Sequence, residues 1–152
     1  MNVGVPVLWW RSVGHTHTAY VMETVMDDLA AAAGRDPVEF RLSMLKDKPR
    51  EAGVLKLAAE KAGWGKSPAS GVHRGIAVHK SFNSYVAQVA EVRVDDDGEY
   101  KVERVVCAVD CGIAVNPDNI AAQMEGGIGY GLGHAIRNEI TLTNGEVDQG
   151  NF

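Results

Sequence analysis

The chain has 152 residues, and 15 Lys plus Arg against 20 Asp plus Glu give a formal net charge of −5. No basic excess exists to neutralise phosphates, so nucleic acid is not an expected partner. The hydrophobic fraction of 45% suffices for a core and the charged fraction of 23% is ordinary, which excludes disorder and fibrous repeats. No stretch reaches the roughly 18 apolar residues of a membrane span.

The first half is predicted to be helical. Apolar side chains recur at three- and four-residue spacing over residues 17–33, and Gly34 supplies a stop. Asp36-Pro37-Val38-Glu39 predicts an N-cap, a first-turn proline and a capping box, opening a second helix that runs to about Lys46. A third helix is expected from roughly Glu51 to Ala62.

The second half is predicted to form strands over residues 75–81, 85–94 and 100–110, followed by a helix over 118–136. Because residues 105–109 are continuously apolar, the third strand is expected to be central and covered on both faces. A last hairpin, residues 140–147, turns at Asn144-Gly145 in type I′ geometry, and its short return strand suggests missing sequence.

The predicted fold class is therefore α+β, with N-terminal helices followed by a mainly antiparallel sheet packed with a glycine-rich helix. The helical part covers about 15–65 and the sheet with its helix about 71–152. Residues 1–152 form a single domain or a segment of a larger subunit. Residues 1–7 lack the pattern of a secretory signal, so the compartment, cytoplasmic or periplasmic, is not indicated.

Glycine is over-represented, with 17 in the chain, about 11% against a usual ~7%. Five glycines fall between 126 and 133, and in a helix they forgo about 5 kcal/mol of propensity. The cluster predicts a close approach of bare backbone, beside Gln123 one turn earlier, either to a ligand or to a packed sheet. No Walker motif or GxGxxG in its strand–helix context supports a phosphate loop.

Polar residues elsewhere in the chain suggest several candidate sites, each with more than one interpretation. Arg11 before a helix could hold a phosphate or carboxylate, or could pair with an acid beside a capped helix. His15 and His17 could ligate a metal, as in a zinc hydrolase, although no third ligand is visible. Asp110 suits a general base or, more simply, a cap of the Gly112 loop. Cys107 and Cys111 are too far apart for a CxxC pair, and an apolar run flanks the first, which excludes a disulfide framework or zinc ribbon; both are expected to be buried thiols. Phe82-Asn83-Ser84 is expected to be a polar loop.

Several motifs, taken in this order, resemble the large, molybdopterin-binding subunit of the xanthine dehydrogenase and aldehyde oxidase family, and most of all its isoquinoline 1-oxidoreductase β-subunit type. They cover nearly the whole chain: Arg11-Ser12-Val13-Gly14-His15, Asp36-Pro37-Val38-Glu39-Phe40-Arg41, Val109-Asp110-Cys111-Gly112, Asn116-Pro117 and Gln123-Met124-Glu125-Gly126-Gly127-Ile128 with Tyr130-Gly131-Leu132.

The resemblance implies an oxidoreductase that places water-derived oxygen on an N-heterocycle or aldehyde. Electrons would pass through a molybdenum–molybdopterin cofactor, expected in dinucleotide form, to iron–sulfur clusters on a small partner subunit. The implied cofactor-binding residues are Arg11, Ser12, Val13, Gly14, Gln123, Gly126 and Gly127, with Val13 lining the substrate pocket. A glycine-rich helix start would present backbone amides to the pterin.

Two departures limit the resemblance. The family's catalytic glutamate, in a Gly-Glu motif, would lie beyond Phe152, and the family's upstream Gly-Gln-Gly loop is absent, so no catalytic residue and no metal ligand is assigned here. The chain is therefore expected to be a fragment that is inactive alone, needs the remainder of the large subunit, and exposes apolar surface that favours self-association. The alternative is a non-catalytic scaffold or assembly module that keeps the family pattern.

Overall fold

The computed structural model describes residues 8–150; residues 1–7, on which the signal-sequence argument rests, and 151–152 lie outside the described residues. Contacts divide the described chain into two compact units, one of residues 10–112 and one that contains residues 113–150. Helices and a mainly antiparallel sheet confirm the α+β class. None of the described helices is long and apolar enough to cross a bilayer.

The three predicted N-terminal helices are confirmed to within a few residues. They are α1 (His15–Ala32), α2 (Pro37–Met44) and α3 (Pro49–Ala62). Asp36 caps α2, since its Oδ1 accepts the N–H groups of Val38 at 2.9 Å and Glu39 at 3.0 Å. Gly63 ends α3 in the left-handed region, with φ 68°, a conformation that glycine adopts readily because it has no Cβ.

An antiparallel sheet follows, in the order β1-β2-β3, with β1 (Val72–Ser81), β2 (Ser84–Val94) and β3 (Tyr100–Asp110). The prediction that the third strand is central is wrong, because within the described residues β2 is central and β3 lies at an edge. The apolar run misled because both faces of the sheet are apolar here. Val106 and Ala108 pack into the core, whereas Val105 and Val109 lie on the opposite, half-buried face.

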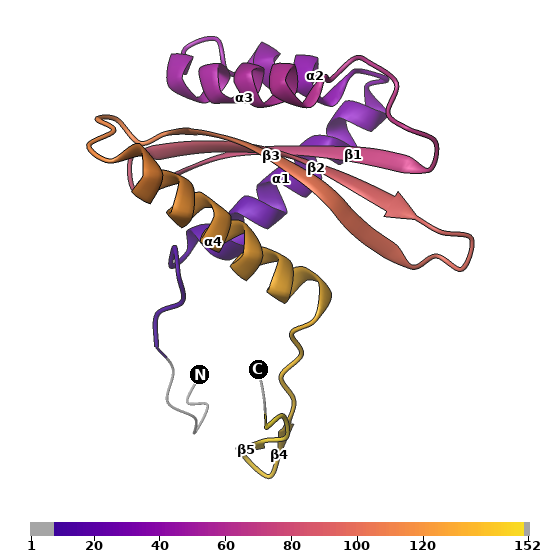
Figure 1. The fold of residues 1–152 in the computed structure, drawn as a ribbon, viewed down its shortest axis with the longest axis vertical. Coiled ribbons are helices and arrows are strands. Elements are labelled where there is room, and N and C mark those ends of the chain that lie inside the picture. Colours follow the sequence, from indigo (N-terminus) through magenta and orange to yellow (C-terminus); the bar gives the residue numbers. More distant parts are fainter. Residues whose placement is uncertain (1–7, 151–152) are drawn as a thin grey trace. The chain divides into compact units, whose positions relative to one another are not determined.

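The core of this unit lies between α3 and one face of the sheet (Figure 1). Leu55 on α3 and Val89 on β2 are both fully buried in it. Around them are packed Val38, Val54, Ala58, Ala59, Ala62, Ile76, Val78, Ala87 and Ala108.

A buried ion pair fastens α1 to both α2 and the sheet. The Arg41 side chain is 1% exposed; its Nε donates to Glu23 Oε2 at 2.9 Å, and its Nη1 lies 2.8 Å from Asp27 Oδ1. The same Glu23 oxygen accepts the backbone N–H of Val78 at 2.8 Å, a donor on the outer side of the edge strand β1. One carboxylate thus satisfies a buried cation and an edge-strand amide.

The second unit contains α4 (Pro117–Ile136) and the short strands β4 (Leu142–Thr143) and β5 (Glu146–Val147). Asn116 caps α4, with its Oδ1 accepting the Asn119 N–H at 3.0 Å. Asn144 and Gly145 have φ of 52° and 85°, which confirms the predicted type I′ hairpin.

Candidate functional site

The residues before α1 form a tight turn in an unusual conformation. Ser12 and Val13 have φ of 62° and 50°, and a β-branched residue seldom adopts the left-handed region. The Val13 N–H donates to the Trp10 carbonyl and the His15 N–H to the Ser12 carbonyl, both at 2.9 Å. Strained backbone of this kind is concentrated at binding and active sites, which supports the prediction of a site here.

The first turn of α1 contains no acidic residue that would offset the positive end of the helix dipole. Gly14 is the N-cap and contributes no side-chain acceptor. Thr16 donates its hydroxyl to the Arg11 carbonyl, and Thr18 donates to the Gly14 carbonyl at 2.7 Å. The two hydroxyls therefore stabilise the main chain of the turn.

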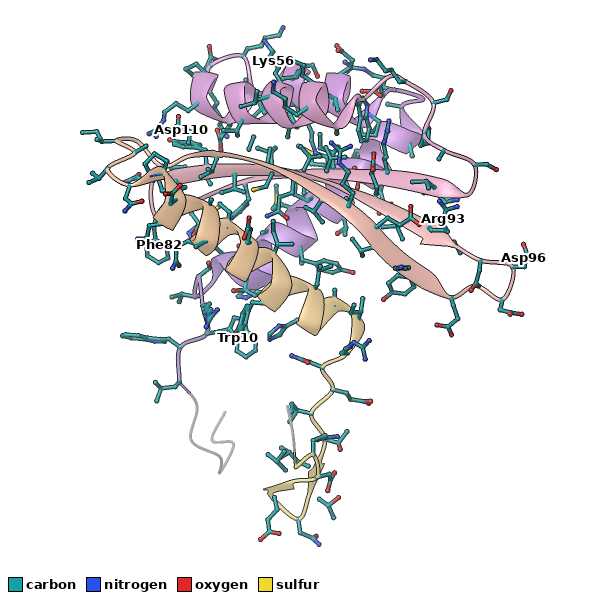
Figure 2. All side chains as sticks on the ribbon, viewed as in Figure 1. Trp10, Lys56, Phe82, Arg93, Asp96 and Asp110 are labelled. Atoms are coloured by element: carbon teal, nitrogen blue, oxygen red, sulfur yellow. The ribbon has the colours of Figure 1, made fainter. Side chains whose placement is uncertain are left out.

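His15 is paired with a histidine that lies far away in the sequence. Its Nδ1 is 2.9 Å from His79 Nε2 near the end of β1, and its ring meets the Phe82 ring edge-on at 5.9 Å. Phe82, labelled in Figure 2, and Asn83 have φ of 46° and 63° and form a two-residue turn between β1 and β2, so the predicted polar loop of residues 82–84 is shorter by Ser84, which begins β2. Among residues 8–150 no three His, Cys, Asp or Glu side chains gather as a metal site would require.

Asp110, at the end of β3, is held as a structural carboxylate. Arg50 donates to it through two nitrogens, at 2.7 and 2.6 Å, and the Gly112 N–H donates at 3.0 Å. These contacts, Arg50 foremost, lower the pKa of Asp110 to about 2, so it is too weak a base for proton abstraction near neutral pH. The capping interpretation is supported over the general base.

The two cysteines differ from the expected buried pair. Cys107 is half-buried, and burial raises the pKa of its thiol, against the opposing effect of its hydrogen bond with Gln88. Cys111 is exposed, because it follows Asp110 in the loop that leaves the sheet, so the prediction of two buried thiols is wrong there.

Strand register brings several of these features to one end of the sheet. Ser81 pairs with Ser84 across the first turn, and Tyr85 pairs with Asp110, so the Phe82-Asn83 turn and the end of β3 lie at the same end. The His15–His79 contact draws the start of α1 to that end as well. A cavity of about 340 Å³ opens nearby, bounded by Pro49, Arg50, Gly53, Leu57, Val109 and Asp110.

The glycine cluster lies in the interior of α4 rather than at its start. Because α4 begins at Pro117, the N–H groups of Gly126 and Gly127 belong to internal helical hydrogen bonds and are not available to a ligand, contrary to expectation. Within its own unit, a Cβ added at either glycine would meet no heavy atom within 4 Å. Gln123 is exposed one turn earlier. The helix therefore presents a strip of open backbone.

Sequence patterns identify neither Arg50 nor His79 as part of this region. Each meets its partner only through tertiary packing, and the pairs are 60 and 64 residues apart. The one available signal is Phe82-Asn83, whose position between two strand patterns fits a two-residue turn.

Comparisons with known proteins bear on the whole chain. A family model described as a molybdopterin cofactor-binding domain matches residues 18–152. The chain is 36% identical to the beta subunit of isoquinoline 1-oxidoreductase from Brevundimonas diminuta, over 97% of this chain and 20% of that protein. It is 33% identical to a nicotinate dehydrogenase subunit of Pseudomonas putida, over 91% of this chain and 13% of that protein.

A third relative, the membrane-bound aldehyde dehydrogenase (pyrroloquinoline-quinone) of Gluconacetobacter polyoxogenes, is 28% identical over 90% of this chain and 20% of its own length. The chain thus spans a fifth or less of the length of these relatives. No solved structure matches it significantly.

Proposed function

Because the chain belongs to the molybdopterin cofactor-binding family, the large subunits of xanthine dehydrogenase and aldehyde oxidase type, we propose that it forms part of the wall of a molybdenum cofactor site. The observation that carries the proposal is the open glycine strip that follows Gln123 on α4. A flat pterin can approach bare helical backbone more closely than any surface that carries Cβ atoms.

The side chains of this segment have distinct parts in the proposal. Gln123 offers an amide donor and acceptor beside the strip, while Gly126 and Gly127 leave room for the ring system. In the turn before α1, Arg11 with Ser12 and Gly14 binds the polar end of the cofactor, and the half-exposed Val13 lines the substrate pocket.

The reaction proposed for the whole subunit is hydroxylation of an N-heterocycle or aldehyde. Isoquinoline and nicotinate in the names of two relatives are N-heterocycles, and the third name is that of an aldehyde dehydrogenase. When bound, the cofactor, in its dinucleotide form, would accept two electrons while water supplies the oxygen, and an iron–sulfur subunit would take the electrons onward. No residue of this chain is proposed as the catalytic base.

Replacing Gln123 by alanine in the complete subunit is expected to lower cofactor retention. Losing a hydrogen-bonding group next to a metal centre costs roughly tenfold to a hundredfold in affinity, and elemental analysis of molybdenum per subunit measures it. Asn119→Ala, which removes an amide one turn nearer the start of α4, is the matched control and should retain the metal. Equal molybdenum in both variants would remove Gln123 from the site.

The isolated 152-residue chain is expected to lack stoichiometric molybdenum and to self-associate. It spans a fifth of the length of its first relative, and α1 exposes a row of apolar side chains at i, i+3 and i+7: Met22 at 53%, Val25 at 45% and Leu29 at 47%. Elemental analysis and light scattering over a concentration series test the two expectations. A monomer that carries one molybdenum per chain would contradict both.

The competing proposal is a non-catalytic scaffold that keeps the family pattern for protein contacts alone. The surrounding gene separates the two. A reading frame that continues into a Gly-Glu motif, beside a gene with cysteines for two iron–sulfur clusters, supports the enzyme. A stop codon after Phe152 without that neighbour supports the scaffold.

A further inference from the structure

The turn of residues 11–14 is joined to the sheet through the side chain that directly follows it, by the hydrogen bond between His15 Nδ1 and His79 Nε2 at 2.9 Å. We propose that this bond positions the turn for its ligand, and that it persists only while no more than one of the two rings is protonated. The ligand part of this inference rests on the proposed function.

Two turns with unusual backbone meet at His15. Ser12 and Val13 precede it closely, and the Phe82 ring of the β1–β2 turn lies 5.9 Å from its ring centre. Positive φ at non-glycine residues persists only where surrounding contacts hold it. His15 contacts both His79 and Phe82, so one side chain links the strained turn before α1 to the strained turn of the sheet.

The chemistry of imidazole sets the protonation limit. With both rings neutral, one nitrogen of the pair carries a proton and the other accepts it. A first added proton can bind the nitrogen of the donor ring that faces away from the pair, and the hydrogen bond stays intact. A second must occupy the accepting nitrogen, so that two N–H groups face each other and the bond is lost.

The charges around the pair place this loss on the acidic side. Burial, and then the neighbouring His15, lower the pKa of the His79 ring below its ordinary value, against the opposing effect of Glu23 and Glu51. A histidine whose pKa is lower in the folded chain than in the unfolded chain favours the folded state at pH values above the unfolded pKa of about 6.5. This contribution to stability is lost as the pH falls through the pKa of the folded state. The charged and titratable groups nearby are His17 and Glu23 on α1, Arg41 on α2, Lys48 and Glu51 at the start of α3, and Lys80 on β1.

The test compares three variants of the 152-residue chain by hydrogen exchange at single amides. His79→Leu removes the bond, and His79→Gln keeps a polar nitrogen near the position of Nε2 but does not titrate. His73→Leu is the control, since His73 is an exposed histidine on the same strand. The reporters are the N–H groups of Val13 and His15, which close the turn.

At pH 8, His79→Leu should lower the protection of both reporters by about tenfold, as expected for the loss of one hydrogen bond. His73→Leu and His79→Gln should stay within about threefold of the native chain. As the pH is lowered from 8 through the folded pKa of His79, which lies below its ordinary value, the native chain should lose about tenfold in protection, whereas His79→Gln should not change. Unchanged protection at Ala87 and Val89 in the core shows that each variant is folded.

The proposal is overturned if His79→Leu leaves both reporters protected, or if His79→Gln follows the native pH profile. Exchange is measured without cofactor, so this result is independent of the proposed function. A second measurement tests the ligand part: in a complete subunit shown to hold molybdenum, His79→Leu should retain less of it than His73→Leu. Equal retention would overturn the positioning role and leave the proposed function intact.

Discussion

Replacing Glu23 by alanine is expected to lower the free energy of unfolding of the residue 10–112 unit by about 3 kcal/mol, the lower end for breaking a buried ion pair. The substitution leaves Arg41, 1% exposed, without the partner of its Nε, and leaves the Val78 N–H without an acceptor. Asp27 still pairs with the guanidinium, which keeps the loss from being larger. Urea unfolding, followed by circular dichroism, measures the change.

Two further variants separate charge from hydrogen bonding at this position. Glu23→Gln keeps one acceptor oxygen and should cost less, about 1–2 kcal/mol. Asp28→Ala removes an exposed acid from the same helix and should stay within about 0.5 kcal/mol. A cost below about 1 kcal/mol for Glu23→Ala would show that the carboxylate does not hold α1 to the sheet.

This ion pair and the His15–His79 bond act at different points along one helix. Glu23 fixes the middle of α1 to β1 through Val78, and His15 fixes its first residue to the end of the same strand. The Arg11–Gly14 turn continues directly into α1, so its position depends on both contacts. Loss of Glu23 should therefore disturb the turn through the helix, whereas loss of His79 should act on the turn directly.

The sequence was sufficient for the local structure because local chemistry decides it. The Asp36-Pro37 junction has its capping acceptor and its restricted φ within two residues, and the Asn144-Gly145 turn needs only two left-handed residues. The edge position of β3 could not be predicted in this way. An apolar strand pattern reports that both of its faces are apolar, and strand order depends on pairing with the other strands.

The candidate site was predictable only in part. Family motifs drew attention to Arg11–Gly14 and to Gln123–Gly127, but they gave no indication that Val13 has positive φ or that Gly126 lies in the interior of a helix. His79 has no partner within its own strand, and its contact with His15 exists only because α1 lies along the edge of the sheet. Pairings across more than 60 residues require the fold itself.

Adding a methyl group to the glycine strip is expected to have opposite effects on the helix and on the proposed site. In α4, Gly126→Ala and Gly127→Ala should each favour the helix by about 1 kcal/mol, because alanine restricts the unfolded chain and has the highest helix propensity. The added Cβ meets no atom in its own unit, so no clash opposes this gain. Circular dichroism of the 152-residue chain should show equal or greater helicity.

In the complete subunit, the same two substitutions should lower molybdenum content by at least about tenfold if the pterin lies against this strip, since each methyl group occupies space that the ring system needs. Gly133→Ala is the matched control: it brings the same gain in propensity in the last turn of α4, where its Cβ would make an ordinary 3.8 Å contact with Asn138. A general fault in folding would lower helicity and molybdenum together in all three variants. Loss of metal with helicity preserved, at Gly126 and Gly127 but not at Gly133, can come only from the strip itself, and full metal content in all three would exclude these glycines from the cofactor site.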